Sequence, residues 1–225
     1  MMHEQERLTF GKMQNPVRGF LHGTASVASV LGAVGLWVRS SGDPPRQIAL
    51  LVFAVSLVAL YTVSSLYHSV PWRRTWKERM QRVDHSMIYV LVAGSYTPMA
   101  YIVLDGWMRD AALGMAWGIA LVGILQKTFF PRVGHGFSIA LQTLQGWLAL
   151  PLLVPLAQRL PLPAVLLIVL GGLSYTVGMV FLVTERPRLW PRVFSYHEVF
   201  HICVVAGSAA HYAATFRYVA RFTGA

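Results

Sequence analysis

The segment His197-Glu198-Val199-Phe200-His201 places two histidines four residues apart at the start of an apolar stretch. On a helix this spacing puts both imidazoles on one face, one turn apart, where a single metal ion can reach both. Ionisable side chains inside a membrane helix are rare and expensive to bury, so they usually mark a functional site. The segment therefore predicts a metal site, provided that its helix spans a membrane.

The composition indicates an integral membrane protein. Of the 225 residues, 55% are hydrophobic and only 12% are charged, and the mean hydropathy is +0.51. A soluble domain typically has about twice this share of charged residues, and it could not hide so much apolar surface. Charge-poor runs of about 20 residues, the length that crosses a bilayer, occur at seven places. These runs are Gly19 to Val38, Gln47 to Val70, Val83 to Leu104, Ala111 to Phe130, Phe137 to Leu156, Leu162 to Thr184, and His197 to Val219.

We therefore predict an all-α membrane protein, a bundle of seven transmembrane helices. Short connections and the lack of linker-like composition favour a single membrane domain over residues 19–225, after a short polar tail of residues 1–18. Pro151 and Pro155 should kink the fifth span, because proline removes a helical hydrogen bond.

Basic residues are distributed unevenly between the two sides of such a bundle. Thirteen of the 19 Lys and Arg residues lie in the N-terminal tail or in the connections after spans two, four and six, and six lie on the other side. This is the positive-inside pattern, so the N-terminus should be cytoplasmic and the C-terminus outside. The net charge of +10 thus indicates orientation in the inner (plasma) membrane of a cell and attraction to anionic headgroups, not nucleic-acid binding.

This orientation gives each polar residue of the spans a depth. The span ends that meet on the cytoplasmic side carry residues suited to metal binding or proton transfer, and scattered structural histidines would have no reason to share one side. They are His22, Ser64, His68, Asp84, His197 and His201. His211 lies roughly 15 Å beyond His201 along its helix, too far away for the same ion.

Three neutral imidazoles suit Zn²⁺ and leave a fourth coordination position for water, as in catalytic zinc sites. We predict that His68, His197 and His201 are the ligands. Asp84 would either bind the ion directly or act as general base toward the bound water. Ser64 lies one turn before His68, from where its hydroxyl would orient the Asp84 carboxylate or bond the metal-bound oxygen.

Plainer interpretations exist for several of these residues. His22 is a ligand, a hydrogen-bonding partner behind the ligands, or an interfacial histidine bonded to a backbone carbonyl. Ser64 could instead bond the carbonyl one turn back, as serine often does in membrane helices. The lone Cys203 cannot form an intramolecular disulfide and is expected to pack between helices.

Three blocks of the sequence resemble the signature of the hemolysin III family. They are Ser64-Ser65-Leu66-Tyr67-His68, Val83-Asp84-His85-Ser86-Met87-Ile88-Tyr89 through Ala93-Gly94-Ser95-Tyr96-Thr97-Pro98, and His197-Glu198-Val199-Phe200-His201. That family is grouped with the progestin and adiponectin receptors and the alkaline ceramidases as seven-helix metal hydrolases. The resemblance implies zinc at the three predicted histidine ligands, with Asp84 and Ser64 around the metal-bound water. One block departs: where many members carry Glu-x-x-Asn-x-x-x-His, this sequence has Asn15, Arg18 and His22.

The favoured function is a zinc-dependent hydrolase that acts within the membrane on a lipid amide or ester, because zinc both activates water and polarises a carbonyl. Membrane lipids are the expected partners. Two alternatives stay open, a non-enzymatic regulator or sensor in which zinc only joins helices, and a cytolytic protein as the family name suggests. Polar residues concentrated on one leaflet argue against a permanent pore. Haem is disfavoured, because His197 and His201 lie one turn apart on one helix and could not both serve one iron.

Overall fold

The computed structural model describes residues 13, 15–130, 135–190 and 193–224, and these residues form helices and connections without a β-strand. The helices are α1 (Pro16–Arg39), α2 (Pro44–Ser69), α3 (Arg74–Pro98), η1 (Met99–Val103), α4 (Gly106–Phe129), α5 (His135–Trp147), α6 (Leu150–Arg159), α7 (Leu162–Thr184), α8 (Tyr196–Ala214) and η2 (Thr215–Val219). Seven segments are long and apolar enough to cross a membrane, where η1 extends α3, α6 continues α5, and η2 extends α8. The predicted fold class and the predicted number of spans are confirmed.

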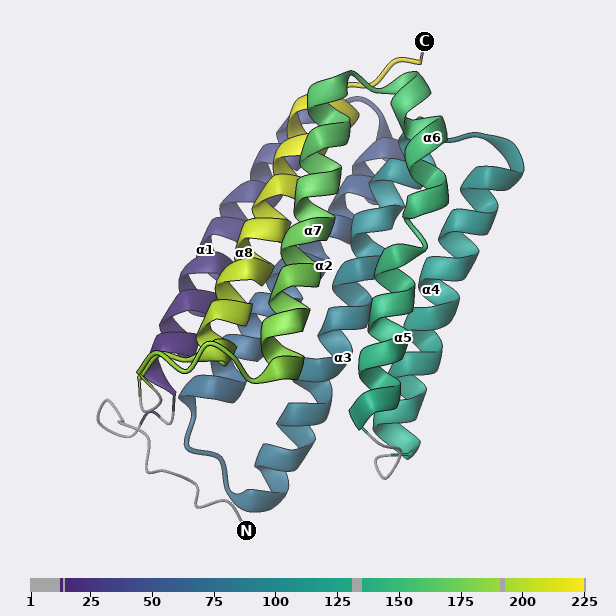
Figure 1. Ribbon diagram of the computed structural model, residues 1–225. Helices are drawn as coiled ribbons and strands as arrows, with labels where there is room; N and C mark the ends of the chain where they lie inside the picture. Colours follow the sequence, from purple (N-terminus) through teal and green to yellow (C-terminus); the bar gives the residue numbers. More distant parts are fainter. Residues whose placement is uncertain (1–12, 14, 131–134, 191–192, 225) are drawn as a thin grey trace.

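The helices lie side by side, with the start of α1 and the end of η2 at opposite ends of the bundle (Figure 1). Helices α2 and α3 are central, since 50% and 56% of their most apolar stretch is buried, against 11% for α1. The lower end in Figure 1 collects the start of α1, the end of α2, and the starts of α3 and α8. We call it the histidine end, because His22, His68 and His197 lie on these segments.

Helix α3 and the fifth span differ from the sequence-based prediction. Helix α3 begins at Arg74 instead of Val83, because hydropathy detects only the apolar part of a helix. The polar first turns of α3 include an i,i+4 ion pair of 3.7 Å between Arg74 and Glu78. The fifth span is broken, not kinked: α5 ends at Trp147 and α6 starts afresh at Leu150 with a proline in its first turn. Proline fits the first turn of a helix, where its missing N–H costs no hydrogen bond.

The first helix also begins earlier than predicted. Helix α1 starts at Pro16, so the last residues of the predicted tail are helical and Arg18 is buried. The first twelve residues of that tail lie outside the described part of the chain. Arg18 is thus a member of the bundle and not a charge on a solvated tail.

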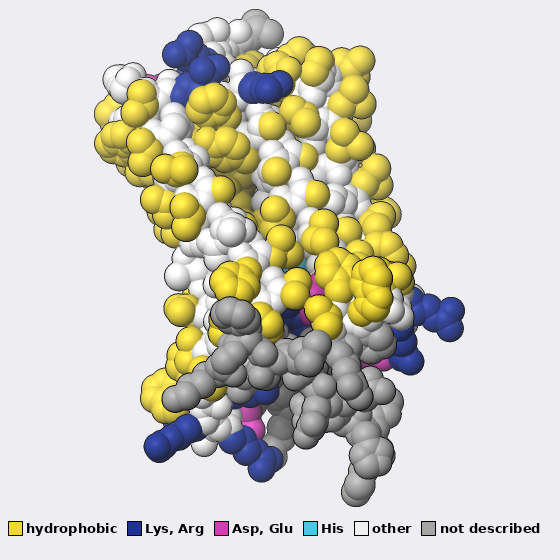
Figure 2. Space-filling view, turned by 90° about the vertical axis from the view of Figure 1, so that its left-hand side faces the viewer, with side chains coloured by type: hydrophobic (Ala, Val, Ile, Leu, Met, Phe, Trp, Pro, Cys, Tyr) yellow, Lys and Arg dark blue, Asp and Glu magenta, His cyan; other side chains and the backbone are white. Residues whose placement is uncertain are grey.

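Apolar side chains cover the middle of the face shown in Figure 2, with Lys and Arg side chains at both ends. Large apolar residues are exposed on these helices, for example Leu31 at 69% and Leu170 at 58%. In water such a surface would be unstable, whereas in a bilayer it contacts lipid tails. Inside, α7 and α8 approach closely at Gly171 and Gly207, where an added Cβ would lie 3.1 Å and 3.0 Å from the other glycine's carbonyl oxygen.

Candidate metal centre

Two helices bring three histidines together at the histidine end. The last turn of α2 carries His68, and the first turns of α8 carry His197 and His201. One ligand nitrogen from each histidine can be chosen so that all lie within 4.8 Å of one another. The ring centroids of His68 lie 5.5 Å from His197 and 5.0 Å from His201, and those of His197 and His201 are 4.9 Å apart. The structure therefore assembles the predicted three-histidine group from residues about 130 positions apart in the sequence.

The environment of this group suits a metal ion. His68 and His201 are each only 3% exposed, and the Nδ1 atom of His201 is buried without a hydrogen-bond partner among the described residues. A buried polar atom without a partner is costly, so it usually indicates a ligand or water that completes it. Three imidazoles offer the nitrogen donors that zinc prefers, which makes the residues present a chemical fit for this ion.

A carboxylate and a hydroxyl lie beside the same turn of α2. Asp84 from α3 is 8% exposed and Ser64 from α2 is 4% exposed, and a hydrogen bond joins their side chains. Because Ser64 precedes His68 by one turn, the Ser64 hydroxyl fixes the Asp84 carboxylate next to the turn that carries a histidine of the group. The orienting role of Ser64 stays a prediction, and this hydrogen bond is the contact that it requires.

His22 of α1 adds a fourth buried imidazole. Its ring stacks on the His201 ring with centroids 4.0 Å apart and an angle of 17° between the planes, and it meets Tyr61 edge-on at 5.1 Å. Neither of its ring nitrogens makes a hydrogen bond of normal geometry to a described residue. His22 is therefore buried and packed against a predicted ligand, and it lies outside the group of three.

Comparison with known proteins bears on this site. The family model described as haemolysin-III related matches residues 10–212, which include every residue of the candidate centre. The chain belongs to the haemolysin III family.

Relatives at full length support this assignment. The chain is 30% identical to hemolysin-3 of Bacillus cereus over 97% of its own length and 98% of the relative, and 33% identical to the hemolysin-3 homolog of Bacillus subtilis (strain 168) over 84% and 86%. It is 24% identical to the human monocyte to macrophage differentiation factor over 90% of its own length and 83% of that protein. This haemolysin III family member is thus a multi-pass membrane protein, and its bacterial relatives suggest the plasma membrane.

An ion pair not anticipated from the sequence braces the centre in this family member. The Nε atom of Arg18 donates to Oε1 of Glu198 at 2.6 Å, and both side chains are almost fully buried. The other oxygen of Glu198 accepts the backbone N–H of Ser195 at 2.8 Å, which closes a capping box at the start of α8. Glu198 therefore joins α1 to the turn of α8 that carries His197 and His201.

The signal for this pair was present but incomplete in the sequence. Arg18 lies four residues before His22, and Glu198 lies between two predicted ligands, so both share the histidine end. Sequence spacing does not give the rotation of α1 about its axis, which decides whether Arg18 faces α8 or the lipid. Arg18, one of the residues that depart from the family's first block, is thus linked to the candidate centre through Glu198.

Two other residues of α8 lie outside the centre. Cys203 packs against α7, where a Cβ added to Gly178 would lie 2.8 Å from the Cys203 Cβ. This contact matches its expected packing role. The Nε2 atom of His211 lies 3.1 Å from the carbonyl oxygen of Ile168, so this histidine has a partner in the other half of the bundle.

Proposed function

We propose that this chain is a zinc-dependent hydrolase that cleaves an amide or ester bond of a membrane lipid. The observation that carries the proposal is the group of His68, His197 and His201, with ligand nitrogens within 4.8 Å of one another in helices apolar enough to span a bilayer. The buried Asp84 carboxylate, hydrogen-bonded to Ser64 one turn before His68, adds what a purely structural zinc site would not need.

Zinc held by the three histidines would supply a Lewis acid that polarises the scissile carbonyl and lowers the pKa of water to about 7. An oxygen of the Asp84 carboxylate takes the proton from the attacking water. The Ser64 hydroxyl donates a hydrogen bond to that carboxylate and holds its orientation. Asp84 then delivers the proton to the leaving amine or alkoxide, which returns the carboxylate to its starting state.

A lipid is the substrate class that fits the surroundings. His197 is more accessible than the nearly fully buried His68 and His201, so this side of the group is the one open to a substrate. Histidine and acidic side chains are visible between apolar side chains near the lower end of the face in Figure 2. An acyl chain can lie against such apolar side chains while its carbonyl reaches the polar groups.

The decisive test is Asp84→Asn, assayed on a panel of acyl-amide and acyl-ester lipids in detergent, with zinc measured on the same samples. The amide keeps the shape of the side chain and loses the base, so hydrolysis should fall by about 100-fold or more while zinc remains. Undiminished hydrolysis in Asp84→Asn would refute the catalytic role of Asp84. A zinc-replete wild type that is inert on the whole panel would favour the alternative, a regulator in which zinc only joins α2 to α8.

The proposal also places the centre in the cytoplasmic leaflet, because basic residues are in excess at the histidine end. Single cysteines at Thr75 and Ser41, both exposed and at opposite ends, test this in a Cys203→Ala background. In intact cells an impermeant thiol reagent should label the Ser41→Cys variant and spare Thr75→Cys. Both should react after the membrane is permeabilised, and labelling of Thr75→Cys in intact cells would invert the orientation.

A further inference from the structure

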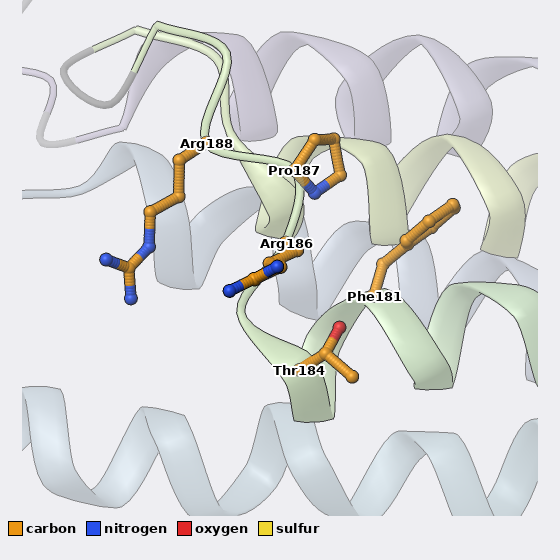
Figure 3. A pocket seen from close by; sticks show the side chains of 5 residues that line it. All are labelled: Phe181, Thr184, Arg186, Pro187 and Arg188. Atoms are coloured by element: carbon orange, nitrogen blue, oxygen red, sulfur yellow. The ribbon is translucent and has the colours of Figure 1, made fainter.

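A second site lies where α7 ends. A cavity of about 660 Å³ is lined by Phe181 and Thr184 from the last turn of α7 and by Arg186, Pro187 and Arg188 from the segment that follows. Figure 3 shows the two guanidinium groups toward one side of this cavity and the Phe181 ring on the other. Its lining therefore combines an apolar part with two cations.

The charges in this cavity are not balanced. Glu185 neutralises the charge of Arg188. The Arg188 guanidinium donates to the Glu185 carboxylate at 3.2 Å and to the Glu185 backbone carbonyl oxygen at 3.3 Å. Arg186 is exposed, and its guanidinium has no ion pair or hydrogen bond with any residue that the structure describes. One positive charge is therefore left over beside an apolar surface, which attracts an anion with an apolar part.

The depth of the cavity identifies the kind of anion. Val180 and Val183 on the preceding turns of α7 are 53% and 55% exposed, as expected for side chains that contact lipid tails. Beyond the cavity, Trp190 is 68% exposed, and tryptophan is enriched at the level of lipid headgroups. The cavity thus lies at the boundary where phospholipid phosphates are found, and the planar guanidinium group binds phosphate through two parallel hydrogen bonds.

We infer that this cavity binds the phosphate of an anionic phospholipid, with Arg186 as its main contact and Phe181 against the lipid's apolar part. This site is separate from the candidate metal centre and does not depend on hydrolysis. Its role is to hold a lipid of defined charge at the α7–α8 connection.

Native mass spectrometry of delipidated protein, titrated with phosphatidylglycerol or phosphatidylcholine, tests this inference. Phosphatidylglycerol should bind more tightly than phosphatidylcholine, and Arg186→Gln should weaken its binding about fivefold, the effect of one basic residue near an anionic lipid. Glu185→Gln should strengthen the binding of phosphatidylglycerol, because it removes a negative charge and the ion-pair partner of Arg188.

The matched control is Arg73→Gln, which removes the same charge from an exposed arginine at the same end of the bundle, outside the cavity. Arg73→Gln should bind phosphatidylglycerol as tightly as the wild type does. All variants should keep the wild-type elution profile in size-exclusion chromatography and the wild-type zinc content. Equal weakening in Arg186→Gln and Arg73→Gln would overturn the site. Equal affinity for both lipids, or complete displacement by millimolar inorganic phosphate, would overturn its assignment to an anionic phospholipid.

Discussion

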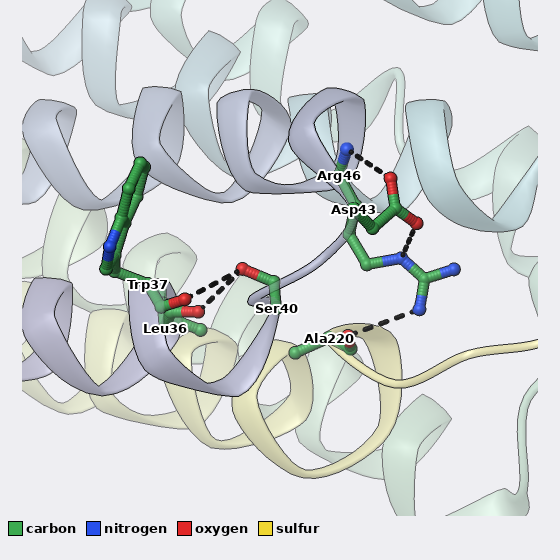
Figure 4. A network of polar contacts seen from close by, with 6 residues as sticks. All are labelled: Leu36, Trp37, Ser40, Asp43, Arg46 and Ala220. Carbon is green, nitrogen blue, oxygen red and sulfur yellow. Dashed lines mark hydrogen bonds and ion pairs between the residues drawn. The ribbon is translucent and has the colours of Figure 1, made fainter.

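The two ends of the bundle both carry networks of polar side chains, but the buried atoms that lack a hydrogen bond to a described residue differ in kind between the two ends. At the end opposite the histidines, Asp43 caps α2 by accepting the backbone N–H of Arg46 at 3.1 Å, and its other oxygen lies 3.1 Å from the Arg46 Nε (Figure 4). Arg46 also donates to the Ala220 carbonyl oxygen at 3.4 Å, and the Ser40 hydroxyl donates to the Leu36 carbonyl oxygen at 2.8 Å. These contacts close the ends of α1, α2 and η2 on one another.

At the opposite end these atoms include the Nε atoms of Arg39 and Arg46, whereas at the histidine end most of them are imidazole nitrogens. Arg18 and Glu198 pair with each other, whereas both ring nitrogens of His22 and the Nδ1 of His201 are buried without a hydrogen bond to a described residue. A guanidinium nitrogen carries its proton at all ordinary pH values and cannot bind a metal ion, whereas a neutral imidazole nitrogen can. Several buried imidazole nitrogens without a partner among the described residues are what a metal site requires.

The largest expected effect is the loss of zinc when a histidine of the group of three is removed. His201→Ala should lose most of the bound zinc, a greater loss than the roughly 10- to 100-fold typical of residues behind the ligands. Metal content of the purified variant, measured by mass spectrometry, checks this outcome. His85→Ala is the control, since His85 lies at the same end but outside the group of three, and it should keep its zinc. Full zinc occupancy in His201→Ala would remove the basis for the proposed centre.

The next effect concerns the ion pair that supports the histidine end. Glu198→Ala leaves the Arg18 charge buried without its carboxylate and removes the capping box, so the free energy of unfolding should fall by about 3–5 kcal/mol. Unfolding in mixed micelles measures this change. The double variant Arg18→Met/Glu198→Met, which removes both charges, should recover most of the loss. If the double variant were as unstable as Glu198→Ala, the cap and not the ion pair would carry the stability.

The smallest effect lies at the opposite end. Asp43→Ala removes the α2 cap and should lower the free energy of unfolding by about 0.5–2 kcal/mol, with zinc content unchanged. Asp43→Asn keeps an acceptor for the Arg46 N–H, so its free energy of unfolding should change little. A change in zinc content in Asp43→Ala would show that the two ends are coupled, which the separate networks do not predict.

The parts of the fold and the site that could be predicted are those set by local signals. Hydropathy located seven spans, because each needs a long apolar run. It gave the sixth span, helix α7, as Leu162 to Thr184, the bounds that the structure has. The alternation of spans then placed His68 at the same end as His197, and helical spacing added His201. These inferences need only length, charge and periodicity.

The remaining features depend on how helices are rotated and where they stop. The stacking of His22 on His201 and the Arg18–Glu198 pair require α1 to turn one particular face toward α8. The π-helical segments η1 and η2, which extend α3 and α8, have no signature in hydropathy, because they alter backbone hydrogen bonding without altering composition. Such features arise from packing between segments far apart in the chain.

The candidate centre draws on α1, α2, α3 and α8, and this has a consequence for biosynthesis. Helices α1, α2 and α3 are synthesised early and α8 is synthesised last. A nascent chain therefore contains His22, His68 and Asp84 long before His197 and His201 are added. A chain that ends before α8 holds only one histidine of the group of three, His68. Loading of an ion at the proposed centre would therefore follow the synthesis of α8, and an occupied centre would report that this last helix had been made.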